Sequence, residues 1–151
     1  MGLCASKSLH EACEDGDESE VLELLWMCKA DVDSRDEKLR TPLHIACKNG
    51  KSEIAMTLMR ERADCEALDW RKNTPLHLAC IYGHSRLVFV LLQKISDKNA
   101  RDVHNNTPLH LACLGGHSEI AMSLIEAGVG IDEVNGTGCT ALHYACDKGL
   151  Y

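Results

Sequence analysis

The chain has 151 residues, which is enough for one ordinary domain, and its formal net charge is -7. Hydrophobic residues make up 45% of it and aromatic residues only 4%, so Leu, Ile, Val, Ala, Met and Cys must form the core. The acidic balance excludes a general nucleic-acid binder, because such proteins need a surplus of Lys and Arg to displace counterions. No apolar run approaches the roughly 18 residues of a membrane span, so we expect neither a transmembrane segment nor a secretory signal.

The first residues, Met-Gly-Leu-Cys-Ala-Ser-Lys, fit the pattern of an N-myristoylated chain. Gly2 is the candidate site for myristate, and Cys4 is the candidate site for palmitate. The second lipid matters because a single myristoyl group binds membranes only marginally. The first helix is expected to begin near Ser8, which leaves a very short tail for a membrane anchor. An acylated and an unmodified N-terminus therefore both remain open.

Residues 9–13 read Leu-His-Glu-Ala-Cys, and Gly16 and a second apolar run with Val21 and Leu24 follow. This segment is a degenerate copy of a unit that recurs further along the chain, with one extra residue before Val21. A polar, atypical first unit is typical of the N-terminal cap of a repeat array. The acidic residues of its turn are Glu14, Asp15, Asp17, Glu18 and Glu20.

The unit is clearest in the string Thr-Pro-Leu-His-Ile-Ala-Cys at residues 41–47. It returns at 74–80 and 107–113, and as Thr-Ala-Leu-His-Tyr-Ala-Cys at 140–146, each time 33 residues after the previous copy. Thr fits a helix N-cap, Pro the first helical turn, and a later Gly a left-handed helix end. A second apolar run, such as Ile54, Leu58 and Met59, has the spacing of a second helix. The fixed period predicts a stack of small helical units rather than a globule around one active site.

These units resemble the ankyrin repeat in their period and in the Thr-Pro-Leu-His-x-Ala signature. The resemblance implies an all-α fold, an ankyrin-repeat solenoid of helix-turn-helix repeats with β-hairpin loops, with about four full repeats and a partial fifth. It also implies a single domain over residues 1–151. We expect a capping repeat at 1–35, internal repeats at 36–68, 69–101 and 102–134, and a partial repeat at 135–151.

Cysteine and histidine recur in register, at Cys47, Cys80, Cys113 and Cys146 and at His44, His77, His110 and His143. Equivalent positions in stacked helices lie roughly 8–10 Å apart, which exceeds the reach of a disulfide, about 7 Å. We therefore expect reduced, buried thiols, which favour the cytoplasm or the nucleus. Pairs such as His44 and Cys47 are also too far from the next pair to share a metal ion. The resemblance implies that these histidines are structural and bond the Thr hydroxyl and the neighbouring turn.

No catalytic arrangement stands out along the chain. The pairs His84-Ser85 and His117-Ser118 recur in register, whereas catalysis needs one asymmetric constellation of groups. No Gly-rich phosphate loop is recognisable either. We therefore expect no enzymatic activity, no cofactor and no metal site.

The resemblance implies that the repeated positions build the stack, while variable positions at the hairpin tips and first helices form a concave binding face. These positions carry basic charge although the chain is acidic, and they have an apolar, aromatic centre around Trp70 and Tyr82. Trp, Tyr and Arg dominate interaction hot spots, and an apolar cluster ringed by charge is the usual anatomy of an interface. We expect a monomer that binds an acidic protein or peptide with an apolar anchor, unless Trp70 merely covers its neighbouring hairpin. The candidate partner-binding residues are Arg35, Lys38, Arg40, Lys48, Leu68, Trp70, Arg71, Asn73, Ile81, Tyr82, Arg101, Val103, His104, Asn106 and Leu114.

Two further features depart from the repeat pattern. Asn99 lies in a stretch that is similar to the sequence around the Asn that is hydroxylated in many ankyrin repeats, and an ordinary turn residue is the alternative. Met56, Phe89 and Met122 share a convex position that is usually charged in this family. They form either a second contact or oligomer interface, or a buried part of a slightly rotated helix.

The hairpin position that usually holds Gly is occupied here by Leu39, Lys72, Asn105 and Gly138. Leu and Lys tolerate a positive φ poorly, whereas Asn and Gly accept it. We therefore expect the hairpins of Leu39 and Lys72 to be strained or differently shaped.

The fifth copy stops at Tyr151, shortly after Gly149, so we expect the stack to end on an apolar face. The chain is then either a piece of a longer protein or a short protein with a frayed end. We expect non-catalytic protein–protein recognition through the concave face. The alternatives are an acylated, membrane-associated adaptor and an ankyrin segment of a larger enzyme or channel. The expected location is the cytoplasm, with the nucleus possible, or a membrane if Gly2 and Cys4 are acylated.

Overall fold

A computed structural model describes residues 7–150 of the chain. Within this range it contains nine helices and no strand, which confirms the all-α solenoid. Over the same residues, none of the helices has the length and the apolar character needed to cross a bilayer. The helices are α1 (Leu9–Asp15), α2 (Glu18–Trp26), α3 (Pro42–Lys48), α4 (Ser52–Arg60), α5 (Pro75–Tyr82), α6 (Ser85–Leu92), α7 (Pro108–Leu114), α8 (Ser118–Glu126) and α9 (Ala141–Asp147).

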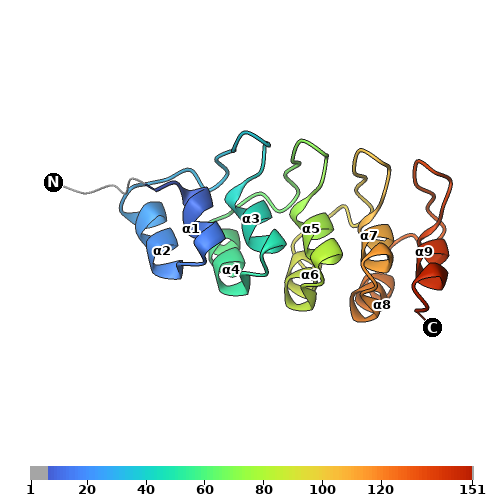
Figure 1. Cartoon of the computed structure of the whole chain (residues 1–151). Coiled ribbons are helices and arrows are strands. Elements are labelled where there is room, and N and C mark those ends of the chain that lie inside the picture. Colours follow the sequence, from blue (N-terminus) through green and yellow to red (C-terminus); the bar gives the residue numbers. More distant parts are fainter. Residues whose placement is uncertain (1–6, 151) are drawn as a thin grey trace.

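The helices stand in two rows, and the loops between repeats project together from one side (Figure 1). One row contains α1, α3, α5, α7 and α9, and each of these packs against its neighbours in the row. The other row contains α2, α4, α6 and α8, each packed against the first helix of its own repeat. Each repeat therefore contacts mainly the repeats next to it, as expected of a solenoid.

Local sequence explains where the first helices begin and end. Thr41 and Thr74 are extended N-cap residues, and each hydroxyl accepts the backbone N–H three residues later at 3.4 Å. The following prolines occupy the first helical turn, where a backbone N–H has no helical partner. Gly83 follows α5 with φ 80°, and a Cβ there would lie 2.6 Å from the ring of His117. Both the left-handed backbone and the close approach of the next repeat therefore require glycine.

The core runs the length of the stack and is built from aliphatic side chains and cysteines. Leu43, Leu76, Cys47 and Cys80 are fully buried, and Cys113 is 4% exposed. Burial in apolar surroundings raises the pKa of these three thiols, which makes them poor nucleophiles. The prediction was wrong for Cys146, which is exposed. The reason is that no second helix packs over α9 within residues 7–150.

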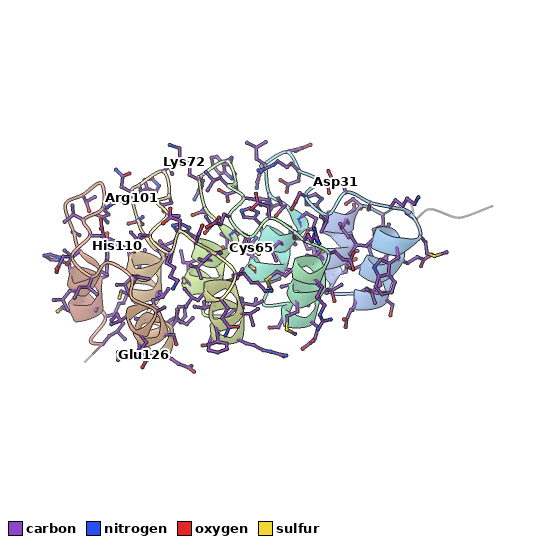
Figure 2. All side chains as sticks on the ribbon, turned by 180° about the vertical axis from the view of Figure 1, so that it is seen from behind. Asp31, Cys65, Lys72, Arg101, His110 and Glu126 are labelled. Atoms are coloured by element: carbon purple, nitrogen blue, oxygen red, sulfur yellow. The ribbon has the colours of Figure 1, made fainter. Side chains whose placement is uncertain are left out.

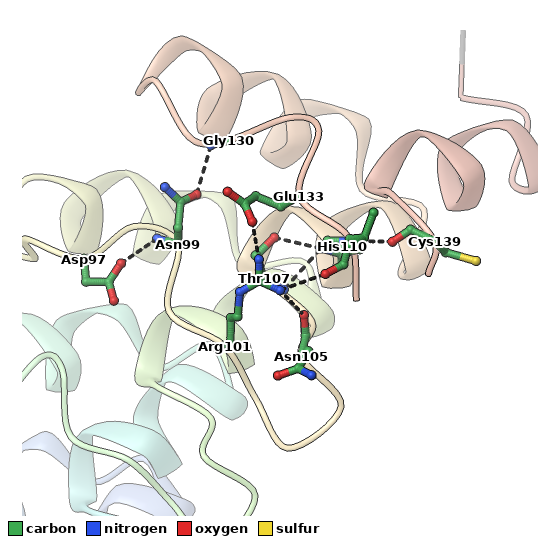
Figure 3. A network of polar contacts seen from close by, with 10 residues as sticks. Asp97, Asn99, Arg101, Asn105, Thr107, His110, Gly130, Glu133 and Cys139 are labelled. Carbon is green, nitrogen blue, oxygen red and sulfur yellow. Dashed lines mark hydrogen bonds and ion pairs between the residues drawn. The ribbon is translucent and has the colours of Figure 1, made fainter. Parts of the chain in front are cut away.

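The recurring histidines join each repeat to the next one. The Nδ1 of His44 accepts the backbone N–H of Thr41 at 3.1 Å, and its Nε2 lies 2.9 Å from the carbonyl oxygen of Asn73. Since a carbonyl can only accept, Nε2 must carry the proton. His77 and His110 repeat this pattern. The Nε2 of His110 lies 3.0 Å from the carbonyl oxygen of Cys139 (Figure 3). The structural role is thus confirmed for these three histidines.

His143 differs from the other three histidines. It keeps its contact with the hydroxyl of Thr140 at 2.9 Å, but its side chain is exposed. The described residues contain no following turn for its Nε2 to bond. The contact with Thr140 is therefore as expected, and the bond of His143 to a neighbouring turn stays a prediction.

A second set of histidines also ties the repeats together, and the sequence pattern did not reveal its role. The Nε2 of His84 lies 3.0 Å from the carbonyl oxygen of Lys48, and that of His117 lies 3.1 Å from that of Ile81. These carbonyls lie at or near the ends of first helices, where helical partners are missing. The recurrence of His-Ser at the start of the second helices was the signal that could have found them.

Candidate protein-interaction surface

The loops between repeats form tight hairpin turns at residues 36–40, 69–73, 102–106 and 135–139. In the second turn, the N–H of Asp69 donates to the carbonyl oxygen of Asn73 at 3.0 Å, and the N–H of Lys72 returns to Asp69 at 2.9 Å. The carboxylate of Asp69 accepts the backbone N–H groups of Arg71 and Asn73, both at 2.8 Å. This acidic side chain is therefore used within its own turn.

The residue before the end of each turn has the left-handed backbone that the sequence indicated. Leu39 has φ 55°, Lys72 has φ 58° and Asn105 has φ 59°. Leu and Lys adopt this region only at a cost in free energy. The strain expected at the first two of these hairpins is therefore present in the backbone.

Successive hairpins are linked by backbone hydrogen bonds into one ledge. The N–H of Trp70 donates to the carbonyl oxygen of Lys38 at 3.1 Å, and that of Val103 donates to Arg71 at 2.9 Å. Gly136 continues the series with His104 at 2.8 Å. Because each tip is held by its neighbour, the side chains on the ledge are presented in fixed register.

Two of the predicted binding arginines are part of this scaffold. Arg35 donates through Nη1 to the carbonyl oxygens of Leu39 at 3.0 Å and Leu68 at 2.6 Å. Arg101 donates through Nη1 to Val134 at 2.7 Å and forms an ion pair with Glu133 (Figure 3). Both guanidinium groups thus bridge one repeat to the next. The same repeat position holds Arg35, Leu68, Arg101 and Val134 in turn, so an arginine alternates with an apolar residue. This alternation is a sequence signal for the bridging role.

Three more predicted residues bind within their own turn. Arg40 pairs with the carboxylate of Asp36 at 2.6 Å. Burial alone would raise the pKa of Asp36, but the hydrogen bonds from Arg40 and from the N–H of Lys38, together with the charge of Arg40, outweigh burial and lower it. The side-chain amides of Asn73 and Asn106 donate to the aspartates that open their turns, at 3.2 and 3.1 Å. These side chains hold the ledge in place rather than project from it.

The remaining predicted residues, apart from the exposed Leu68, fall into two rows. At the hairpin tips, Lys38, Trp70, Arg71, Val103 and His104 are exposed. The guanidinium of Arg71 lies 4.6 Å from the centre of the Trp70 ring, which is a cation–π contact. Figure 2 shows Lys72, which is also exposed, on this side of the stack.

The second row follows the C-terminal ends of the first helices. Tyr82 and Leu114 are the last residues of α5 and α7 and are exposed, whereas Lys48, the last residue of α3, is half-buried. Ile81 is half-buried against the core. At 1.5 Å per residue, α5 separates Tyr82 from the hairpins by about 10 Å. Trp70 and Tyr82 therefore belong to two separate rows, at opposite ends of the first helices. The linear sequence could not distinguish these rows.

Asn99 has a structural role that the sequence did not indicate. Its side-chain oxygen accepts the N–H of Gly130 at 2.9 Å, and its own N–H donates to Asp97 at 3.0 Å (Figure 3). Glu66, one repeat earlier, accepts the N–H of Asp97 in the same way at 2.8 Å. Hydroxylation of Asn99 stays a prediction, and the acylation sites Gly2 and Cys4 lie outside the described residues.

Apolar side chains on the row of second helices are exposed to solvent. Phe89 is 62% exposed and Met122 is 55% exposed, whereas Met56 is half-buried. The interpretation that a rotated helix buries these residues was therefore wrong for Phe89 and Met122.

Among the described residues, no three His, Cys, Asp or Glu side chains converge in a way that could hold a metal ion.

Paired short helices, a 33-residue period and linked hairpins define a helical repeat solenoid with an extended surface. The family model described as "Ankyrin repeats (3 copies)" matches residues 9–102 and 95–151. The chain belongs to the ankyrin-repeat family, as the sequence motifs predicted. Ankyrin repeats are generally protein-interaction modules and are generally non-catalytic.

The chain is also similar to a human protein, "Ankyrin repeat domain-containing protein 7" from Homo sapiens. The two are 44% identical over 50 residues, which is 33% of this chain and 20% of that relative. The match thus spans about a fifth of the relative's length.

Proposed function

We propose that this chain is a non-catalytic recognition module that binds a protein or peptide through its hairpin face. The hairpin face comprises the exposed tips of the linked hairpins and the exposed ends of the first helices. The single observation that carries the proposal is the pair of Trp70 and Arg71, stacked on a hydrogen-bonded ledge. A large apolar ring in a fixed position loses little conformational freedom on binding.

The size of the Trp70 side chain supports a role as an anchor. It is 53% exposed, and a Trp side chain buries about 150–250 Å² when fully covered. Covering the exposed half would therefore remove about 100 Å² from water, or about 2.5 kcal/mol at 25 cal/mol per Å². This is the range of an interaction hot spot.

The charge of the hairpin face favours an acidic partner. Lys38, Arg71 and Lys72 are exposed at the tips, while Asp36 and Asp69 are engaged by backbone N–H groups of their own turns. Surface charges of this kind steer association more than they add affinity. We therefore expect the rate of association to fall as salt is added.

Affinity capture with the double variant Trp70→Ala/Tyr82→Ala tests this function. Each substitution should weaken binding by about 2 kcal/mol, or about 30-fold. Phe89→Ala is the matched control, because Phe89 is an equally exposed aromatic residue on a second helix. Partners that survive the double substitution but are lost with Phe89→Ala would show that the wrong face was chosen.

The motif at Gly2 and Cys4 supports a second function, a membrane-associated adaptor. Lys7 forms ion pairs with Asp15 at 2.5 Å and Glu20 at 2.8 Å, two residues of the acidic turn of the first repeat. The acidic turn of that repeat would then face an anionic membrane unfavourably. Mass spectrometry of the chain from a eukaryotic host tests acylation, and Gly2→Ala should move an acylated protein from the membrane fraction to the supernatant. An unmodified Gly2 would remove this alternative.

The wider setting of the module is also a proposal. Free thiols at Cys28, Cys65, Cys139 and other positions favour a reducing compartment, the cytoplasm or the nucleus. A segment of a larger enzyme or channel would use the same hairpin face for docking. We favour a monomeric module, and sedimentation of the purified chain tests this.

A further inference from the structure

Three basic residues at the hairpin tips share one register along the stack. Lys38, Arg71 and His104 follow one another at intervals of 33 residues, and each is the central residue of its hairpin turn. All three side chains are exposed. They form a line of hydrogen-bond donors on the hairpin face, which we call the cation row.

The backbone holds the cation row at a fixed spacing. The carbonyl oxygen of Lys38 accepts the N–H of Trp70 at 3.1 Å. The carbonyl oxygen of Arg71 accepts the N–H of Val103 at 2.9 Å in the same way. The first helices of successive repeats also pack against one another, which places equivalent residues roughly 8–10 Å apart. A matching partner therefore needs one anionic group for each repeat, at this spacing.

An apolar row runs beside the cation row. Trp70 and Val103 directly precede Arg71 and His104, and they are 53% and 45% exposed. The guanidinium of Arg71 lies 4.6 Å from the centre of the Trp70 ring, so charge and ring are presented together. In the first of these hairpins the same position holds Glu37, which is exposed. Apolar partner groups therefore fit beside the second and third members of the cation row, and not beside the first.

Among the regular conformations of a peptide, the polyproline II helix matches this spacing best. It has three residues per turn and rises about 3.1 Å per residue, so every third side chain returns to the same side after about 9 Å. In a β-strand, side chains three residues apart point to opposite faces. In an α-helix, residues three or four apart lie only about 5–6 Å from each other, and about seven residues are needed to span one repeat.

We propose, on the basis of the recognition function above, that the hairpin face binds an acidic segment in the polyproline II conformation. The segment carries a carboxylate at every third residue, with proline or other apolar residues between them. The carboxylates accept hydrogen bonds from the cation row, and Arg71 can bind one of them through two N–H groups. The intervening rings pack on Trp70 and Val103, because polyproline II ligands dock on exposed aromatic side chains.

Two synthetic peptides of equal composition test the spacing. The phased peptide has Glu at every third position with two Pro residues between, Glu-Pro-Pro-Glu-Pro-Pro-Glu. The control peptide, Glu-Pro-Glu-Pro-Glu-Pro-Pro, has Glu at every second position. Fluorescence anisotropy with the full chain at low ionic strength should show saturable binding of the phased peptide, at least threefold tighter than that of the control. Because the two net charges are equal, the difference reports the spacing alone.

Protein variants locate the peptide on the hairpin face. Arg71→Gln removes the centre of the cation row and should weaken binding of the phased peptide at least fivefold. Arg60→Gln is the matched control and should leave binding unchanged, because Arg60 is exposed on a second helix. Lys38→Gln/His104→Gln should bind the two peptides equally, because a single remaining member of the row does not sense spacing. A urea unfolding curve for each variant shows that the stack is intact.

The outcomes separate this partner from the wider function. Equal binding of both peptides by the wild type would overturn the polyproline II segment, but a loss of binding in Trp70→Ala would still support recognition of acidic peptides by the hairpin face. Equal binding of the phased peptide by wild type and Arg71→Gln would place the peptide elsewhere and overturn the proposal. It is also overturned if neither peptide binds, whereas the affinity capture described above would still test the hairpin face.

Discussion

Replacing His77 with alanine removes the side-chain contacts that join the second and third internal repeats. The ring Nδ1 accepts the N–H of Thr74 at 3.1 Å and lies 2.8 Å from its hydroxyl, and Nε2 donates to the carbonyl oxygen of Asn106 at 3.2 Å. His77 itself is fully buried. His143→Ala is the matched control, because His143 has the same position in its helix but is exposed.

The expected cost follows from these contacts. A net contribution of about 1 kcal/mol for each of three hydrogen bonds gives about 3 kcal/mol, and a buried N–H left without a partner adds about 1 kcal/mol. His77→Ala should therefore lower the free energy of unfolding by roughly 3–4 kcal/mol, a large part of the roughly 5–15 kcal/mol of an ordinary domain. Water can replace the contacts of His143, so His143→Ala should cost less than about 1 kcal/mol.

Urea unfolding followed by circular dichroism measures both costs. Equal destabilisation by the two substitutions, within about 0.5 kcal/mol, would refute the reasoning, because burial would then not control the value of the contacts. Thr74 and Asn106 remain in both variants, so the comparison isolates the ring.

The same variant has a distinct pH dependence. Burial lowers the pKa of His44 and His77 below the usual value for histidine, because it disfavours the charged ring. The stability that depends on the neutral rings is present above about pH 6.5 and is lost as the pH falls towards the folded-state pKa. The free energy of unfolding of the wild type should therefore decrease between pH 7 and pH 5. The decrease should be smaller in His77→Ala. An unchanged slope would mean that His77 does not titrate in the unfolding equilibrium.

Three further substitutions, and the alkylation of two cysteines, can be checked on the purified chain. Lys72→Gly should raise the free energy of unfolding by about 0.5–1 kcal/mol, since φ is 58° there, and a lower urea midpoint would contradict this. Gly83→Ala should cost about 2–3 kcal/mol and Gly116→Ala about 1 kcal/mol, because only the first Cβ would meet a histidine ring, at 2.6 Å. Cys146 should be alkylated in the native protein and Cys80 only in denaturant, as measured by peptide mass spectrometry. Equal alkylation of both thiols would show that the stack opens in native conditions.

The helices and their ends could be predicted from the sequence because their causes are local. The hydroxyl of Thr74 caps α5 by accepting the N–H of His77, and Pro75 fixes the first turn of the same helix. The left-handed backbone at Lys72 follows equally from its place in the repeated turn. Contacts of this kind need no knowledge of the neighbouring repeat.

The candidate binding face could be predicted only in part, because some of its contacts are not local in the sequence. The variable positions were identifiable, but the sequence combined Trp70 and Tyr82 into one centre, whereas α5 separates them. It also gave no sign that Ile81 is half-buried or that its carbonyl accepts a hydrogen bond from His117. Such contacts depend on how repeats stack.

Arg71 and Arg101 show which properties of the candidate surface the sequence determines and which depend on the tertiary structure. From the sequence alone, both are basic residues at variable positions of successive repeats, and both belong to the same candidate surface. In the tertiary structure, Arg71 lies on the ring of Trp70 and is exposed, whereas Arg101 reaches the carbonyl oxygen of Val134, 33 residues away. The sequence by itself determined the repeat, its caps and its buried faces, because those depend on neighbours within a few residues. Only the stacking of repeats decided which charged side chains bind the scaffold and which remain free for a partner.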